Sequence, residues 1–131
     1  MKLIIISQTK KLYEQDIKMV TVPGKEGELG ILPGHVNLIS ILDTGEVKIK
    51  EKDKEVTFVI NGGIIEIKND ELIILANEAA LAPELVAKEI DEAIKMAEEK
   101  RRGLLEPTEL IQLEKQLRYE KLKRKMTDKL G

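Results

Sequence analysis

The chain has 131 residues, of which 42% are hydrophobic and 35% are charged, and its formal net charge is −2. That length allows one ordinary core, or a small domain with an appendage, and the near balance of charge argues against general affinity for nucleic acid. The absence of cysteine excludes disulfides and thiolate metal sites, and the scarcity of aromatic residues argues against modules that stack nucleic-acid bases. No apolar run approaches the ~20 residues that cross a bilayer, so we expect a soluble chain without direct bilayer insertion.

Residues 1 to about 78 are predicted to form β-strands throughout. Segments rich in β-branched or alternating apolar residues are separated by turn signals at 43–45, 61–63 and 69–70. The expected strands are 3–6, 17–22, 28–32, 46–50, 56–60, 64–67 and 72–75. Turn signals roughly every 8–12 residues favour a sandwich or a barrel. Adjacent apolar residues such as Ile64-Ile65 suggest that some strands bury one face in the core and the other against a partner.

Residues 22–35 contain four glycines and two prolines. Glycine readily takes a positive φ and proline fixes φ, so this segment should form tight turns around the short strand 28–32 and present Glu28 and His35 at a sheet edge. The glycine spacing matches no phosphate-binding loop, and no helix pattern follows it. No serine or cysteine lies at a suggestive spacing from His35. We therefore predict no catalytic residue, and on residue chemistry alone Glu28 is a solvated carboxylate and His35 a turn residue.

The period of the apolar residues changes after residue 82, where Pro83 can open a helix. A first helix is expected from 83 to 102, ended by Gly103, with an apolar stripe formed by Val86, Ile90, Ala93, Ile94 and Ala97. A second helix should begin at Pro107, with a stripe formed by Leu110, Leu113, Leu117, Leu122 and Met126. The short connection predicts an antiparallel helical hairpin. The chain should thus divide into an all-β domain, 1–82, and an all-α domain, 83–131.

The segment Val22-Pro-Gly, followed by Gly27-Glu-Leu-Gly-Ile-Leu-Pro-Gly-His35, resembles the signature of the epsilon subunits of rotary F-type ATP synthases, bacterial or chloroplast. The likeness continues at 3–9, 12–13, 42–45 and 61–64 and through the helical tail, so it covers essentially the whole length. The resemblance implies a flattened sandwich of two sheets, with about ten strands, followed by a C-terminal α-helical hairpin.

The same resemblance implies a non-catalytic subunit of the central stalk, which helps to couple ion-driven rotation of the c-ring to ATP synthesis. Its implied partners are the gamma subunit, the c-ring and the catalytic alpha and beta subunits. The chain would then be peripheral to the cell membrane on the cytoplasmic side.

Two sets of contact residues follow from the resemblance. Glu28 and His35 match the loop that faces the c-ring. The extended C-terminal helix of the family opposes ATP hydrolysis, and its basic residues meet an acidic segment of a beta subunit. The matching basic residues here are Arg118, Lys121, Lys123, Arg124, Lys125 and Lys129. Without the resemblance, these cations would be read as a solvated helix face near a helix C-terminus.

Some bacterial members of the family bind ATP between the two helices through a motif of the form Ile/Leu-Asp-x-x-Arg-Ala. Ile90 and Asp91 match this motif, and Arg101 lies where a later basic residue is expected. Ile94 and Lys95 replace the motif's arginine and alanine, and isoleucine lacks the planar donor fork that phosphate favours. We expect ATP to bind with at best about millimolar affinity. No other cofactor and no metal are expected.

Two other classes of function stay open at this point. One is a stand-alone nucleotide-sensing module that uses the helical hairpin. The other is a peripheral protein whose basic helix binds anionic lipid or nucleic acid. Salt dependence separates the latter from a stalk subunit, since polyanion binding weakens steeply with ionic strength whereas apolar docking survives moderate salt.

Overall fold

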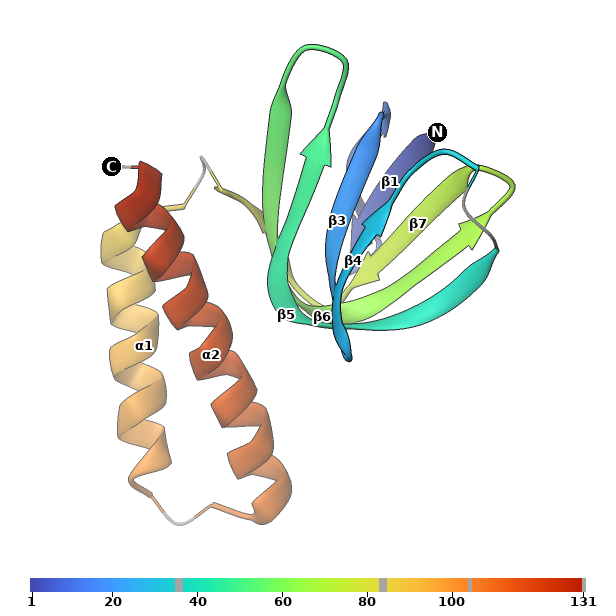
Figure 1. Ribbon diagram of the computed structural model, residues 1–131. Helices are drawn as coiled ribbons and strands as arrows, with labels where there is room; N and C mark the ends of the chain where they lie inside the picture. Colours follow the sequence, from blue (N-terminus) through green and yellow to red (C-terminus); the bar gives the residue numbers. More distant parts are fainter. Residues whose placement is uncertain (35–36, 83–84, 104, 131) are drawn as a thin grey trace. The chain divides into compact units, whose positions relative to one another are not determined.

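The computed structural model describes residues 1–34, 37–82, 85–103 and 105–130, without the side chains of Lys129 and Leu130. The chain forms two compact units, Met1–Ala79 and Ala80–Gly131 (Figure 1). The predicted domain boundary after residue 82 lies close to this division. Eight strands come first: β1 (Lys2–Ser7), β2 (Lys10–Asp16), β3 (Met19–Gly24), β4 (Gly27–Ile31), β5 (Leu38–Lys50), β6 (Glu55–Lys68), β7 (Glu71–Ala76) and β8 (Ala79–Leu81). Two helices follow: α1 (Ala87–Arg101) and α2 (Pro107–Leu130).

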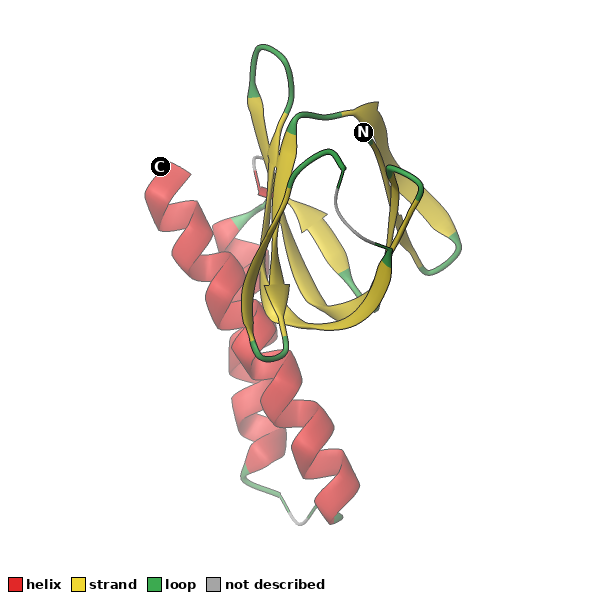
Figure 2. Ribbon diagram, turned by 45° about the vertical axis from the view of Figure 1, so that its right-hand side comes forward, coloured by secondary structure: helices red, strands yellow, loops and turns green. Residues whose placement is uncertain are grey.

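The strands form one curled sheet in the order β2-β1-β7-β6-β5-β3-β4, with β8 paired to β6. Strands β1 and β7 are parallel, and the other neighbours along this order are antiparallel. The sheet folds over on itself and encloses the core (Figure 2). Side chains with no exposed surface come from β1, β3, β5, β6 and β7: Leu3, Ile5, Val20, Val22, Val47, Ile49, Val59, Ile60, Ile65, Leu72 and Ile74. The predicted fold class, a β-sandwich followed by a helical hairpin, is confirmed.

Strands β5 and β6 are longer than the sequence predicted, and this explains why the described residues form eight strands and not about ten. The turn signals at 43–45 and 61–63 lie inside these strands and bend them. Gly62 and Gly63 have φ values of 73° and 151°, which only glycine adopts readily. The pairing runs from Leu42 opposite Gly63 to Thr44 opposite Asn61, so both strands bend at the same level. One sheet can therefore supply both layers of the sandwich.

The two helices run antiparallel and are joined by residues 102–106 (Figure 1). Helix α1 begins at Ala87 and not at 83, because Val86 still has extended backbone angles; Pro83 lies outside the described residues. Helix α2 begins at Pro107, as predicted. Among the described residues, neither helix combines the length and the apolar character that crossing a bilayer requires.

The apolar stripes of the two helices are buried only in part. Ile90 and Ala97 of α1 are buried, as are Leu117 and Met126 of α2. By contrast, Leu110 at the start of α2 is 39% exposed. The hairpin therefore has a narrow apolar seam, and most of the stability of such helices must come from packing and from polar contacts between them.

Candidate partner-binding surfaces

Apolar side chains cover the outer side of four neighbouring strands, β5, β6, β7 and β1. One row across these strands consists of Ile41, Ile64, Leu75 and Ile6, which are opposite one another in the pairing. Ile39, Ile73 and Ile4 continue the same side, with Glu66 among them. We call this set of seven apolar residues the outer apolar face.

The outer apolar face is unusually open. Ile39 is 70% exposed and Ile41 is 57% exposed, while Ile64 and Leu75 are 45% and 51% exposed. Alternation explains its origin, because neighbouring residues such as Ile64 and Ile65 point to opposite sides of the strand, and Ile65 is fully buried. A contiguous apolar patch of this kind on a folded protein marks an interaction site more often than chance exposure.

A groove continues the outer apolar face toward the β3–β4 hairpin. It has a volume of about 590 Å³ and is lined by residues 24–29 and by Ile39, Ser40 and Ile41. Glu28 lies on β4 opposite Pro23 of β3 and is exposed along this groove. The structure thus brings Glu28 next to the apolar face, whereas His35, the other residue predicted to contact a partner here, lies outside the described residues.

The residues of the degenerate nucleotide motif are engaged by helix α2. Ile90 is buried and 4% exposed. The Asp91 carboxylate accepts a hydrogen bond of 2.8 Å from Nε of Arg124, and Nη1 of Arg101 lies 3.4 Å from a carboxylate oxygen of Glu114. Asp91 and Arg101 are also ten residues apart on α1, a rise of about 15 Å. The structure therefore does not bring these residues together around one point.

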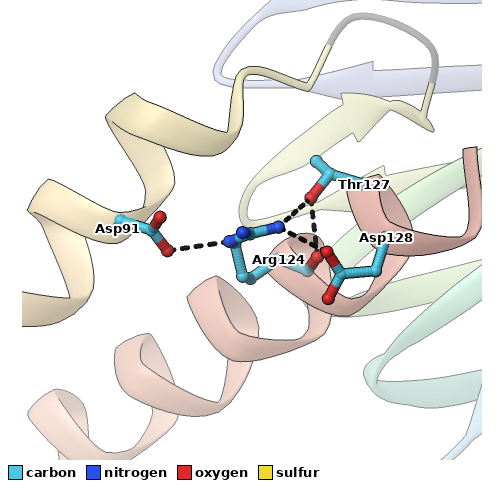
Figure 3. Close-up of polar contacts among 4 residues, drawn as sticks. All are labelled: Asp91, Arg124, Thr127 and Asp128. Carbon is cyan, nitrogen blue, oxygen red and sulfur yellow. Dashed lines mark hydrogen bonds and ion pairs between the residues drawn. The ribbon is translucent and has the colours of Figure 1, made fainter. Parts of the chain in front are cut away.

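Arg124 is the centre of a polar cluster at the end of the hairpin (Figure 3). Besides Asp91, its guanidinium donates from Nη1 to Asp128 and to the Thr127 hydroxyl, each over 2.7 Å. The same hydroxyl donates to the Arg124 carbonyl oxygen over 2.7 Å. The hydrogen bond to Asp91 is the main cause that raises the pKa of Arg124 above its ordinary value. Sequence reasoning placed Asp91 and Arg124 in two different sites; the structure joins them.

The other basic residues predicted to meet a partner are not equivalent. Arg118, Lys121 and Lys125 are exposed. The Lys123 side chain is only 16% exposed; its Nζ lies 3.1 Å from Glu120 and 4.6 Å from the centre of the Tyr119 ring. Lys123 and Arg124 are therefore the least exposed of these predicted contact residues, and the side chain of Lys129 lies outside the described residues.

A second groove lies along the hairpin near its loop, and we call it the hairpin groove. Its volume is about 600 Å³, and it is lined by Arg101, Leu110, Ile111, Glu114, Lys115, Leu117, Arg118 and Lys121. Four of these side chains are basic and one is acidic, above an apolar floor. Sequence reasoning missed Ile111 and Lys115, although their spacing of four residues, followed by Arg118 three residues later, places them on one helix face.

Within the part of the chain that the structure describes, no group of acidic, histidine or cysteine side chains could hold a metal ion. The two grooves and the outer apolar face are candidate surfaces for binding a partner.

Comparison with known proteins identifies the chain. Residues 1–82 match the β-sandwich domain of the ATP synthase delta/epsilon chain. The chain belongs to this family. The ATP synthase epsilon chain of Dichelobacter nodosus is 36% identical over 119 residues, which are 90% of this chain and 81% of that one. The epsilon chain of Pelotomaculum thermopropionicum is 34% identical over 99 residues, 76% of this chain and 74% of that one. The resemblance found in residues 22–35 is confirmed, as is the prediction of a non-catalytic subunit.

Chains in two solved ATP synthase structures resemble this family member in fold. A chain in the mitochondrial ATP synthase of Euglena gracilis, described with its F1 part and c-ring, has a TM-score of 0.75 at 24% identity and covers 92% of this chain; the likeness spans 76% of that chain. A chain of the central stalk and c-ring of the Tetrahymena thermophila enzyme has a TM-score of 0.71 at 16% identity and covers 96% of this chain and 95% of its own. At these identities the likeness concerns the fold.

Proposed function

We propose that this chain is a central-stalk subunit of an F-type ATP synthase, peripheral to the membrane on its cytoplasmic side. In this role the sandwich docks on the gamma subunit and the c-ring and helps to couple ion-driven rotation to ATP synthesis. One observation supports the docking above all others: Ile39, Ile41, Ile64 and Leu75 are each at least 45% exposed on one side of the sheet. A surface of this kind gains free energy when another apolar surface covers it.

The outer apolar face can supply most of the docking energy. Fully burying one large aliphatic side chain contributes about 1.5–3 kcal/mol, whereas association costs at least ~4 kcal/mol in lost freedom of motion. Several such side chains are needed to offset that cost, because each is already partly buried. The face provides four that are at least 45% exposed, with three half-buried side chains beside them. Glu28 adds a carboxylate at the adjoining groove, where it can select a polar loop. The c-ring contact of Glu28 and His35 is a proposal that rests on the family resemblance.

Substitution of Ile41 by glutamate tests the docking. The side chain is 57% exposed, so the sandwich should keep its fold, but a charge on the face would have to be desolvated when gamma binds. We expect the Ile41→Glu chain to lose co-purification with gamma when the subunits are co-expressed.

The matched control is Met96→Glu on α1, because Met96 is 60% exposed and lies outside both the outer apolar face and the hairpin groove. This control chain should co-purify with gamma as the unchanged chain does. Retention of gamma by Ile41→Glu, with circular dichroism equal to that of the unchanged chain, would rule out docking through this face.

The hairpin fits a regulatory role in the same assembly. We propose that it opposes ATP hydrolysis by binding an acidic segment of a catalytic beta subunit. The basic side chains around the hairpin groove support this role, because partly desolvated ion pairs contribute more than exposed ones. Stand-alone nucleotide sensing has less support, since Asp91 and Arg101 are already paired with residues of α2.

A further inference from the structure

The two helices of the hairpin can separate from one end only. Residues 102–106 connect them covalently at one end, so the helices must part first at the other, where α1 begins and α2 ends. The Arg124–Asp91 contact lies at this open end, between the second turn of α1 and the last two turns of α2 (Figure 3). Any force that resists opening there resists separation of the whole hairpin.

Among three ion pairs that join the two helices, the contact at the open end is the shortest. The distances are 2.8 Å for Arg124–Asp91, 3.4 Å for Arg101–Glu114 and 4.0 Å for Lys121–Glu98. Only the first lies within the usual range of a charge-assisted hydrogen bond. In the other two pairs the opposite charges still attract each other, but their distances are too long for hydrogen bonds of well-defined geometry.

The guanidinium of Arg124 is also held in place from its own helix. Asp128, four residues on, and the Thr127 hydroxyl both accept hydrogen bonds from Nη1. These two contacts orient Nε toward the other helix, so little additional side-chain entropy is lost when Nε binds Asp91. Preorganisation of this kind makes a single cross-helix contact more effective than an isolated surface pair.

We propose that Asp91 and Arg124 form a latch that keeps the open end of the hairpin closed. Arg124 cannot bind the carboxylate of a partner through the same Nε while it binds Asp91. Closure of the hairpin therefore competes with an acidic partner for Nε of Arg124. This inference rests on the proposed regulatory role of the hairpin, which it deepens by naming the contact that must break first.

The latch predicts different effects on ATP hydrolysis for substitutions of its two residues. Asp91→Asn weakens the closed hairpin and leaves Arg124 available to the acidic segment. Arg124→Gln weakens the closed hairpin equally but removes a positive charge from the partner contact. In an assembled ATP synthase, Asp91→Asn should slow ATP hydrolysis below that of the unchanged enzyme, whereas Arg124→Gln should not.

Opening can be measured directly in the full-length chain, since it contains no native cysteine. Spin labels at Lys88→Cys and Lys125→Cys, both exposed positions, place one probe on each helix near the open end. Pulsed electron resonance then gives the fraction of chains with the long distance. We expect Asp91→Asn to raise this fraction about two- to fivefold, the range of a partly exposed ion pair. Raising NaCl from about 0.01 M to 1 M should raise it in the unchanged chain and much less in Asp91→Asn.

A second measurement, the rate of cysteine labelling, detects an open fraction that is too small for pulsed electron resonance to measure. Ala97 is 7% exposed, so the thiol of an Ala97→Cys variant reacts with a thiol reagent only after its surroundings open, and the rate scales with the open population. The same two- to fivefold increase is expected for Asp91→Asn. Two variants serve as controls: Asp128→Asn removes a contact within α2, and Glu98→Gln removes the 4.0 Å pair. Both should change the labelling rate less than Asp91→Asn does.

The outcomes separate the latch from the function on which it rests. If Asp91→Asn leaves both the distance distribution and the labelling rate unchanged, the latch does not exist, whatever hydrolysis does. If opening increases as expected but hydrolysis does not change in the assembled enzyme, the latch stands and the inhibitory role of the hairpin is wrong.

Discussion

Tyr13 of β2 shows how one side chain joins distant parts of the sandwich. Its hydroxyl donates a hydrogen bond of 2.7 Å to a carboxylate oxygen of Glu51, and its ring forms a T-shaped pair with that of Phe58, with 5.8 Å between the ring centroids. Burial, followed by the hydrogen bond to Glu51 and its negative charge, raises the pKa of Tyr13 well above its ordinary value of 10. The folded protein therefore keeps this proton at pH values where the unfolded chain loses it.

This raised pKa predicts a loss of stability in alkali. Below about pH 10 both states hold the proton, so the contribution is fully present; above it only the unfolded state releases the proton, and the free energy of unfolding falls as pH rises. Tyr13→Phe should cost about 1 kcal/mol at neutral pH, because the bond to Glu51 is lost, and should flatten the alkaline decline. Urea unfolding at about pH 8 and pH 11 measures both effects. Equal alkaline slopes for the two proteins would contradict the prediction.

At the scale of the element, the bend of β6 requires glycine at position 63 both for its backbone angles and for the lack of space around it. Gly63 has φ 151°, and a Cβ there would lie 2.2 Å from the Leu75 carbonyl oxygen on β7. Gly27 of the β3–β4 hairpin also has a positive φ, 136°, but a Cβ there would meet nothing within 4 Å. The two positions share a backbone preference and differ in the space available.

Alanine substitution at these two glycines should therefore have unequal costs. Gly27→Ala carries conformational strain alone, about 1–2 kcal/mol, whereas Gly63→Ala adds a backbone clash and should cost more than about 3 kcal/mol or prevent folding. Thermal unfolding followed by circular dichroism compares them. Similar melting temperatures for the two variants would mean that β6 can bend without the close approach to β7.

For the whole molecule, the division into two units predicts separable roles. Residues 1–82 contain all eight strands and every fully buried residue of the sheet named above, so this segment should fold without the helices. Assembled with the other subunits in place of the full chain, it should still bind gamma but allow faster ATP hydrolysis. A chain of residues 1–82 that only aggregates would contradict the proposed boundary.

Charge reversal in the intact chain is the companion experiment. Arg118→Glu and Lys121→Glu alter exposed residues of the hairpin groove without removing the hairpin. If each contact to an acidic segment contributes about 0.2–1 kcal/mol, reversing both should speed hydrolysis between about two- and thirtyfold. Hydrolysis that stays the same in both the shortened and the reversed chains would leave the hairpin without an inhibitory role.

Much of this architecture could be predicted from local patterns. Runs of β-branched or alternating apolar residues located most of the strands but not β2 or β8. Pro107 located the start of α2, and the spacing in residues 22–35 pointed to the family. These signals are local because strand and helix periods and turn chemistry are properties of a few consecutive residues. The resemblance also suggested which residues of α2 face a partner, but not which of them are accessible.

What the amino-acid sequence determined by itself is the order and kind of the elements: a β domain, then two amphipathic helices with a narrow seam. Only the tertiary structure decided how distant residues meet. The pairing of β5 with β6 turned two apparent breaks into one shared bend, and the pairing of four strands gathered Ile41, Ile64 and Leu75 into one face. The antiparallel packing of the helices brought Arg124 into contact with Asp91. Strand register and the pairing of side chains between the helices depend on residues far apart in the chain. The periodicity of a short segment carries no information about such long-range contacts.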